Sequence, residues 1–402
     1  MLYRNVFWLG VATALERGLT LAAFAAAAAA LEPSAFGVAA FAQAVSFYVY
    51  SLVELGLPIT LVKSAAERQR NSARLIVPTI VTRLAASSLV GLALWFGVSA
   101  TIGWGESGAA IMLFFAASAA ASFSVAWLFQ GLQRTHWLVI TEGLRGALTV
   151  AAVARFVNGP GDMLRLPLIL VATTLVSGLL QVGIAWWCLR SLRTDWPAFG
   201  EIFNQLLRSA PVGVGGLLVQ TYFQLNILLL KHTGGAFETG VYAGCVRLAA
   251  VPLSVAALLG IAVLPPLTEV ASRGQRALSA VQWTLLRRIA AIVIPAGLVA
   301  CWIAPRLLTR TLGTDYSSGV PALRLLVVFV VVSTLNLPFA QSLIATGRVR
   351  EYFVGVALGA TTNLAVSIPL IGSFGAAGAA AGSTLGAVVA SAWLFLKATD
   401  RI

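Results

Sequence analysis

The sequence predicts an all-α polytopic membrane protein with about 12 transmembrane helices in two six-helix lobes and a central cavity. Three observations predict this class. Of the 402 residues, 59% are hydrophobic and 10% are charged, whereas soluble proteins carry about 25% charged residues. Apolar runs of about 20 residues, the length that crosses a bilayer, recur along the whole chain. Two stretches that lie half a chain length apart also have the same order of residue types.

The repeated stretches are Phe36–Pro58 (FGVAAFAQAVSFYVYSLVELGLP) and Thr239–Leu267 (TGVYAGCVRLAAVPLSVAALLGIAVLPPL). Each opens with glycine in second place, holds an ionisable residue in its apolar run (Glu54 and Arg247), and has proline at its exit. They begin 203 residues apart in a chain of 402. A repeat at half the chain length is typical of two-lobed transporters. We therefore expect an N-terminal lobe over 1–200, with spans 1–6, and a C-terminal lobe over 201–402, with spans 7–12.

The spans follow from uninterrupted apolar runs and from the proline and glycine residues that separate them. In chain order they are 6–31, 36–62, 75–101, 108–129, 136–157, 166–189, 209–230, 240–267, 287–308, 318–344, 351–371 and 374–396. The first run is too long for the apolar core of a cleavable signal, so we expect it to remain as a span. The segments between spans are too short to bury a core of their own, which predicts no soluble domain.

The distribution of Lys and Arg predicts that both termini lie in the cytoplasm. With the N-terminus inside, seventeen basic residues fall in cytoplasmic segments and four in outer segments. Cytoplasmic loops carry the excess of Lys and Arg in membrane proteins. The net charge of +13 is therefore assigned to topology and to an anionic partner. No basic cluster interleaved with aromatic residues suggests nucleic acid.

Six arginines lie inside predicted spans, where a charge costs roughly 2.5–3.5 kcal/mol on the insertion scale unless it meets water or a partner. They are Arg17, Arg83, Arg145, Arg155, Arg247 and Arg324. Arg155 and Arg324 lie near span ends, which favours snorkelling to the interface. For Arg83 and Arg145 snorkelling and cavity lining are equally open. Arg17, near the middle of its span, and Arg247, about two turns inside the eighth, indicate a charged cavity.

Acidic residues at similar depth are fewer. Glu142 and Arg145 are three positions apart and share a helix face, so they form either a local ion pair or part of an ion-coupling site. Glu54 has no partner nearby in sequence and is either a titrating, ion-coupling group or a tether between helices. Glu16 adjoins Arg17 but projects about 100° away from it around the helix.

The seventh span is unusually polar. Gln220, Gln224 and Asn226 either line a hydrophilic passage for substrate or join helices by hydrogen bonds. The last span consists almost entirely of small residues, which allows neighbouring helices to approach closely.

Motifs for other chemistries are missing from the sequence. Cys188, Cys245 and Cys301 each lie alone in an apolar span, which suggests neither a disulfide framework nor a metal site. No phosphate-binding loop, HExxH motif or paired-carboxylate outer loop occurs. We therefore expect that the protein binds no cofactor and that it is not an enzyme.

Five stretches then suggest a family: LEPSAFGVAAFAQAVSFYVYSLVELGLP, GGAFETGVYAGCVRLAAVPLSVAALLG, LLTRTLGTDYSSGVPALRLLVV, LIATGRVREY and IGSFGAAGAAAGSTLG. Their order and spacing resemble the polysaccharide flippases of the O-antigen translocase type, within the multidrug/oligosaccharidyl-lipid/polysaccharide exporter superfamily. The resemblance covers the whole chain, although each motif alone is weak.

The resemblance implies that the protein moves an undecaprenyl-pyrophosphate-linked oligosaccharide from the inner to the outer leaflet of the bacterial cytoplasmic membrane by alternating access. Membrane lipids and a polysaccharide polymerase are the further partners. By position, Arg17 and Arg247 match the cavity arginines of the family, and Arg83, Arg145, Gln220, Gln224 and Asn226 complete the candidate substrate site. One departure concerns Asn226, since many relatives carry an acidic residue in the seventh span.

Two other functions remain open. A multidrug and toxin extrusion antiporter would share the architecture, but it requires an acidic cavity, and the inner spans here hold more Arg than Asp or Glu. A membrane glycosyltransferase or ligase that uses the same lipid carrier would require acidic residues on a large outer loop, and the outer loops are short.

Overall fold

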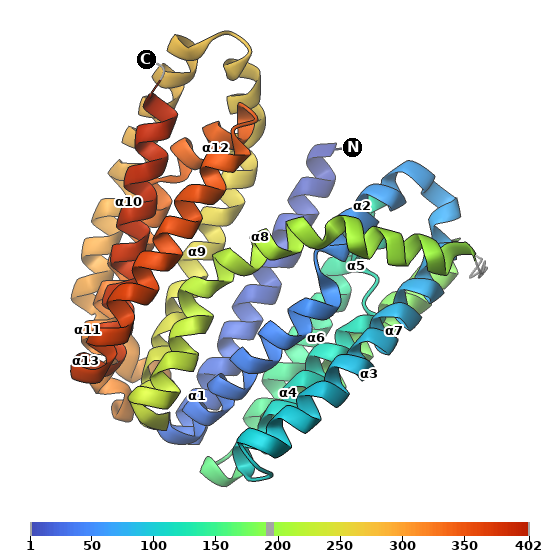
Figure 1. The fold of residues 1–402 in the computed structure, drawn as a ribbon, viewed down its shortest axis with the longest axis vertical. Helices are drawn as coiled ribbons and strands as arrows, with labels where there is room; N and C mark the ends of the chain where they lie inside the picture. Colours follow the sequence, from blue (N-terminus) through green and yellow to red (C-terminus); the bar gives the residue numbers. More distant parts are fainter. Residues whose placement is uncertain (1, 190–196, 401–402) are drawn as a thin grey trace. The chain divides into compact units, whose positions relative to one another are not determined.

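The computed structural model describes residues 2–189 and 197–400, and this part of the chain is helical, with no strand (Figure 1). The helices are α1 (Leu2–Glu54), α2 (Leu57–Arg68), α3 (Ile76–Thr101), α4 (Glu106–Ala120), α5 (Ala126–Gly131), α6 (His136–Phe156), α7 (Arg165–Leu189), α8 (Pro197–Thr233), α9 (Gly235–Ala271), α10 (Gln275–Leu312), α11 (Val320–Leu335), α12 (Leu337–Ala345) and α13 (Val349–Thr399). Short 3₁₀ helices cover Gln69–Leu75, Ala121–Phe123, Pro160–Asp162 and Thr314–Gly319.

Nine helical stretches of the described residues are long and apolar enough to cross a membrane. Two of them, in α1 and α13, have double length and are divided by kinks at Glu32 (φ 61°) and Gly375 (φ 51°). The nine stretches therefore supply eleven of the twelve predicted spans, and the twelfth, 209–230, lies in α8. The prediction of an all-helical, multi-pass membrane protein is confirmed.

The chain forms two compact units, unit 1 (Met1–Leu217) and unit 2 (Leu218–Ile402). Helix α8 begins in unit 1 and ends in unit 2. In unit 1, α1 packs against α4 and α6, and α7 packs against both of those helices. Close approach depends on glycine, because a Cβ at Gly146 of α6 would lie 2.6 Å from the Cβ of Leu19 in α1.

In unit 2, α11 packs against α9, α10 and α13, while α12 packs against α9 and α13. The second half of α13 turns back along the first half after the kink at Gly375. A Cβ at Gly386 would lie 2.5 Å from the carbonyl oxygen of Gly359. The small residues predicted to allow close packing in the last span therefore place the two halves of α13 in backbone contact.

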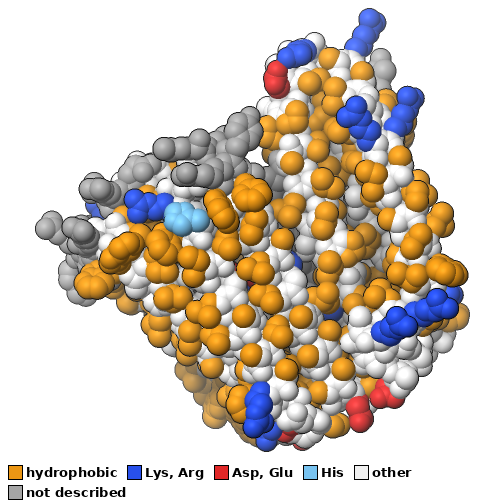
Figure 2. Space-filling model, turned by 180° about the vertical axis from the view of Figure 1, so that it is seen from behind, with side chains coloured by type: hydrophobic (Ala, Val, Ile, Leu, Met, Phe, Trp, Pro, Cys, Tyr) orange, Lys and Arg blue, Asp and Glu red, His pale blue; other side chains and the backbone are white. Residues whose placement is uncertain are grey.

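The outer flanks of the molecule are apolar. Figure 2 shows one face, on which hydrophobic side chains cover the flanks and Lys and Arg lie mainly toward the margins. Leu89 of α3 and Trp302 of α10 are each 72% exposed. Buried positions of α3 include Thr79, Arg83 and Ser87. This helix therefore turns apolar residues outward and polar residues inward, as expected for a membrane protein with a polar interior.

Candidate functional site

Glu54 lies at a helix end within a predicted span. Helix α1 stops at Glu54, and α2 starts at Leu57 after Leu55 (φ 38°) and Gly56 (φ 78°). The run 36–62, expected as one uninterrupted span, is therefore divided directly after its acidic residue. The Glu54 side chain is 32% exposed and lines a cavity of about 260 Å³.

Arg83 of α3 is the partner of Glu54. Its Nη2 atom forms an ion pair with the Glu54 carboxylate and donates to the Tyr50 hydroxyl at 2.9 Å, and its Nη1 atom donates to the carbonyl oxygen of Ser124 at 3.3 Å. Arg83 is only 5% exposed. A charge at such depth requires a partner, so the pair ties α1 to α3 while its carboxylate still reaches the cavity.

Arg145 of α6 holds two carboxylates. Its Nε atom donates to Glu142 Oε2 at 2.7 Å, and its Nη2 atom donates to Glu16 Oε1 at 3.0 Å. The local pair, one of the two alternatives that the sequence left open, is present, and α1 adds a second acid. One guanidinium between two carboxylates leaves the group one negative charge in excess. All three residues line a second cavity of about 260 Å³.

The predicted span 108–129 is interrupted near its end. Helix α4 stops at Ala120, a 3₁₀ turn follows, Ser124 is extended (ψ 125°), and α5 starts only at Ala126. Unpaired backbone groups in a membrane cost several kcal/mol. Gln181 of α7, which is fully buried, accepts from the Val125 amide at 3.0 Å and from the Ser124 hydroxyl at 2.9 Å. Side chains from other helices therefore supply hydrogen-bond partners to residues 124 and 125. We call this interruption the α4–α5 break (residues 121–125).

The α4–α5 break connects the two acidic groups. Nε2 of Gln181 donates to Glu142 Oε1 at 2.9 Å, and Arg83 joins the Ser124 carbonyl to Glu54. Both cavities are lined by Ala121, Ser124, Ala126 and Gln130. Hydrogen bonds therefore run without interruption from Glu54 through the break to Glu142, Arg145 and Glu16.

Arg17 and Arg247 have different settings. Arg17 in α1 of unit 1 is exposed, and within the described residues no ion pair or hydrogen bond holds its side chain. It lies eleven residues into the span 6–31, about 17 Å at 1.5 Å per residue, which is near the middle of a core about 30 Å thick. Arg247 in α9 of unit 2 is half-buried.

Asn226 in α8 lies within a buried network of unit 2. Its Nδ2 atom donates to Ala379 O and Ser383 Oγ, both at 2.9 Å, and to Asn363 Oδ1 at 3.1 Å. Asn226 has no exposed surface, and its contacts join α8 to both halves of α13. This is the geometry of interhelical hydrogen bonding, one of the two possibilities left open by the sequence. Gln224 is half-buried, and the side chain of Gln220 lies outside the described residues.

The two arginines expected to snorkel each contact another group of the protein, Arg324 a backbone carbonyl and Arg155 an aromatic ring. Arg324 Nε donates to the carbonyl oxygen of Cys301 in α10 at 3.2 Å. The helical donor for that carbonyl would be the amide of residue 305, which is Pro305 and has no N–H. Arg324 therefore caps a carbonyl that proline leaves unpaired. The guanidinium of Arg155 lies 5.6 Å from the centre of the Phe156 ring.

Sequence reasoning missed three participants in the unit 1 network: Gln181, Ser124 and Tyr50. A signal for Gln181 was available, since it is an amide side chain in the middle of the apolar run 166–189 and therefore requires a partner inside the protein. For the α4–α5 break no local signal exists, because residues 109–130 contain neither proline nor glycine.

Comparison with known proteins identifies the family. Residues 2–270 match the model of the family described as "Polysaccharide biosynthesis protein". The chain is 26% identical over 194 residues to the "Putative O-antigen transporter" of Escherichia coli (strain K12), a match that covers 46% of this chain and 45% of that protein. The chain thus matches less than half the length of this relative.

Solved structures share the fold at low identity. An inward-facing multidrug resistance MATE family transporter of the MOP superfamily superposes with a TM-score of 0.74 and 16% identity, covering 95% of both chains. The lipid II flippase MurJ in an inward closed conformation gives a TM-score of 0.67 and 12% identity, covering 97% of this chain and 87% of that one. With the family model matching two thirds of its length, the chain belongs to the polysaccharide biosynthesis protein family and has the fold of the MOP superfamily transporters.

Proposed function

We propose that this multi-pass membrane protein is a flippase for undecaprenyl-pyrophosphate-linked oligosaccharides. It carries them by alternating access from the cytoplasmic to the periplasmic leaflet of the bacterial inner membrane, with both of its termini in the cytoplasm. The product enters O antigen, capsule or exopolysaccharide, and a polysaccharide polymerase is a further partner. Units 1 and 2 are the two transport lobes in this proposal.

Arg17 is the observation that carries the proposal. An exposed guanidinium in the middle of an apolar helix is costly unless it meets water or an anion. A pyrophosphate is such an anion, and its oxygens accept the forked donors of arginine in pairs. Arginine also keeps its charge in surroundings where lysine would lose a proton. We therefore assign Arg17 to the pyrophosphate head of the substrate, with Arg247 as the corresponding residue of unit 2.

The other arginines of unit 1 have a different part in the proposal. Arg83 and Arg145 already hold carboxylates, so a phosphate would compete with those ion pairs. Their part is to keep Glu54 and Glu142 at the cavities, where these two acids act as the ion-coupling groups. Glu16, Glu142 and Arg145 together carry one negative charge in excess, which attracts a cation.

The family match supports this function over that of a multidrug antiporter. MATE transporters and MurJ share the fold at 12–16% identity, and similarity at that level extends to architecture alone. The family model concerns polysaccharide biosynthesis, and the exposed Arg17 suits an anionic substrate better than a cationic drug.

The test replaces Arg17 in a strain whose surface polysaccharide depends on this protein. We expect Arg17→Ala to abolish export and Arg17→Lys to restore part of it, because lysine keeps the charge but loses the forked geometry. The matched control is Arg155→Ala, an exposed arginine at the far end of α6. Membrane levels of each variant are measured by immunoblot. If the Arg17→Ala variant exports polysaccharide at the wild-type level, Arg17 does not bind the pyrophosphate and the main support for the proposal is lost.

A further inference from the structure

We propose that Gln181 makes the α4–α5 break of unit 1 a proton-responsive joint, by transmitting the charge of Glu142 to the backbone of Val125. The inference deepens the proposed function and rests on it for the role of Glu142 as an ion-coupling group.

The break is maintained by side chains and not by its own sequence. Residues 109–130 include no proline or glycine and consist mostly of alanine and large apolar residues, which form helix readily. A continuous helix would satisfy every backbone group in this run within the helix itself. The interruption therefore persists because Gln181 serves the Val125 amide and Arg83 serves the Ser124 carbonyl.

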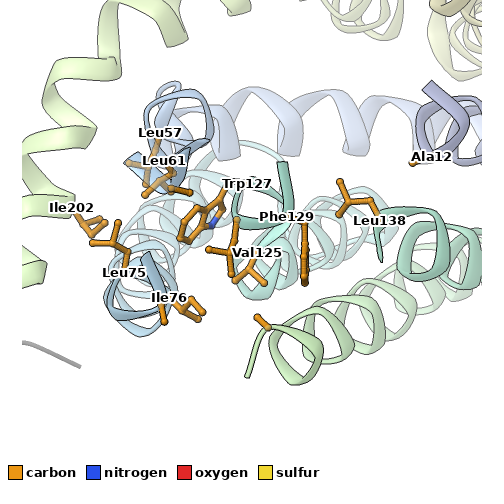
Figure 3. Close-up of a cluster of buried hydrophobic side chains, with 14 residues drawn as sticks. Ala12, Leu57, Leu61, Leu75, Ile76, Val125, Trp127, Phe129, Leu138 and Ile202 are labelled. Atoms are coloured by element: carbon orange, nitrogen blue, oxygen red, sulfur yellow. The ribbon is translucent and has the colours of Figure 1, made fainter. Parts of the chain in front are cut away.

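The residues that follow the break, in α5, are held in place by apolar packing. Val125, Trp127 and Phe129 belong to an apolar cluster with Leu57 and Leu61 of α2 and Leu138 of α6 (Figure 3). Trp127 is 3% exposed and Phe129 is 1% exposed. Packing therefore fixes α5, the helix that follows the break.

Gln181 has one acceptor and one donor group, and both are occupied. Its Oε1 atom accepts from Val125 N–H and from Ser124 O–H, while its Nε2 atom donates to Glu142 Oε1. Both carboxyl oxygens of Glu142 act as acceptors, Oε1 from Gln181 Nε2 and Oε2 from Arg145 Nε. When a hydronium ion gives its proton to Glu142 Oε1 and leaves as water, that oxygen becomes a hydroxyl donor opposite the Gln181 amide group.

Protonated Glu142 and Val125 then compete for the single carbonyl oxygen of Gln181. If the amide turns over to accept from Glu142, its NH₂ group faces the Val125 N–H, and two donors oppose each other without an acceptor. Buried polar groups without a partner are strongly disfavoured. Uptake of one proton thus weakens the backbone hydrogen bond that holds the break.

Charged and polar side chains from three other helices face Glu142 or line its cavity, in addition to Arg145 on its own helix. Arg145 on the same helix and Glu16 on α1 are the charged groups that face it, Gln181 faces it from α7, and Gln130 of α5 lines the same cavity. Because Glu16 shares Arg145, one of the two acids can take a proton while the guanidinium keeps a counter-charge. At the other end of the break, Glu54 is faced by Arg83, which also donates to the Tyr50 hydroxyl.

The experiment measures amide hydrogen exchange of the peptide covering 121–128, in full-length protein in lipid nanodiscs, as a function of pH. Rates are corrected for the intrinsic pH dependence of exchange. In the wild type we expect exchange to accelerate about tenfold as Glu142 takes its proton, the change that loss of one buried hydrogen bond produces. Glu142→Gln, which places an amide donor opposite Gln181, should show the fast rate at every pH.

Two variants distinguish the hydrogen bond between Gln181 and Val125 from the other polar groups of the cavity. Gln181→Leu removes the acceptor for Val125 and should also exchange fast at every pH. Gln130→Leu removes an amide from the same cavity, without a bond to the break or to Glu142, and should keep the wild-type response. If Gln181→Leu does not fold, Glu142→Gln carries the test, because it keeps Gln181 in the protein and alters only the group that faces its amide.

The results distinguish the joint from the proposed function. Wild-type exchange that does not respond to pH, or slow pH-independent exchange in Glu142→Gln, would overturn the inference. A pH-responsive break in a protein that flips no lipid-linked oligosaccharide would leave the joint standing and remove the proposed function.

Discussion

The two members of the Glu54–Arg83 pair should differ in how much their removal costs. Arg83 is 5% exposed, so Glu54→Leu leaves a buried cation with only the Tyr50 hydroxyl and the Ser124 carbonyl as acceptors. Stranding one member of a buried ion pair costs about 3–5 kcal/mol. Glu54 is 32% exposed, so after Arg83→Met the carboxylate can hydrate. The loss is then two hydrogen bonds, to Tyr50 and Ser124, or about 2 kcal/mol.

The double variant Glu54→Leu with Arg83→Met gives the decisive comparison. Replacing a buried ion pair by apolar residues is often nearly neutral, so the double variant should be more stable than Glu54→Leu alone. The assay is thermal unfolding of purified protein in one detergent. At about 2–4 °C per kcal/mol for a domain of this size, Glu54→Leu should lower the midpoint by about 6–20 °C and Arg83→Met by about 4–8 °C.

The control is an exposed pair of the same unit. Lys63 and Glu67 lie 4.0 Å apart with side chains 81% and 61% exposed, so Lys63→Met should cost at most about 1 kcal/mol. Equal losses for Glu54→Leu and Arg83→Met, or a double variant whose loss equals their sum, would refute the argument that burial of Arg83 sets the cost.

Three further changes test other parts of the structure by the same unfolding assay. Asn226→Leu should cost about 2 kcal/mol or more, because its two amide hydrogens are shared among Ala379 O, Ser383 Oγ and Asn363 Oδ1 in a buried network. A loss no larger than that of Gln224→Leu would contradict the network. Trp127→Ala should cost about 3–5 kcal/mol through the cavity it leaves. Trp302→Ala, at an exposed position, should change stability by only about 0.5 kcal/mol. Similar losses for the two variants would mean that α5 is not held by packing. Arg324→Met should destabilise by about 0.5–1.5 kcal/mol by unpairing the Cys301 carbonyl. Pro305→Ala in the same chain should recover part of the loss by restoring the amide, and no recovery would show that Arg324 acts in another way.

The sequence by itself determined the class of the protein and the order of its helices. Apolar length and charge density suffice for this, because a bilayer imposes one length on every span and excludes charge from most positions. The same exclusion made the arginines conspicuous, and the three-residue spacing offered the Glu142–Arg145 ion pair as one of two alternatives. The cavity role of Arg17 stays a prediction. The cytoplasmic placement of both termini remains a prediction from the distribution of Lys and Arg.

Only the tertiary structure decided which polar groups meet. Glu54 finds Arg83 29 positions along the chain, and Arg145 finds Glu16 129 positions away. The run 108–129 looks continuous because helix propensity and hydropathy are properties of neighbours in sequence, whereas its interruption depends on Gln181 and Arg83 from two other helices. A hydrogen bond between helices requires particular faces at a particular distance, and that distance exists only once the helices have packed.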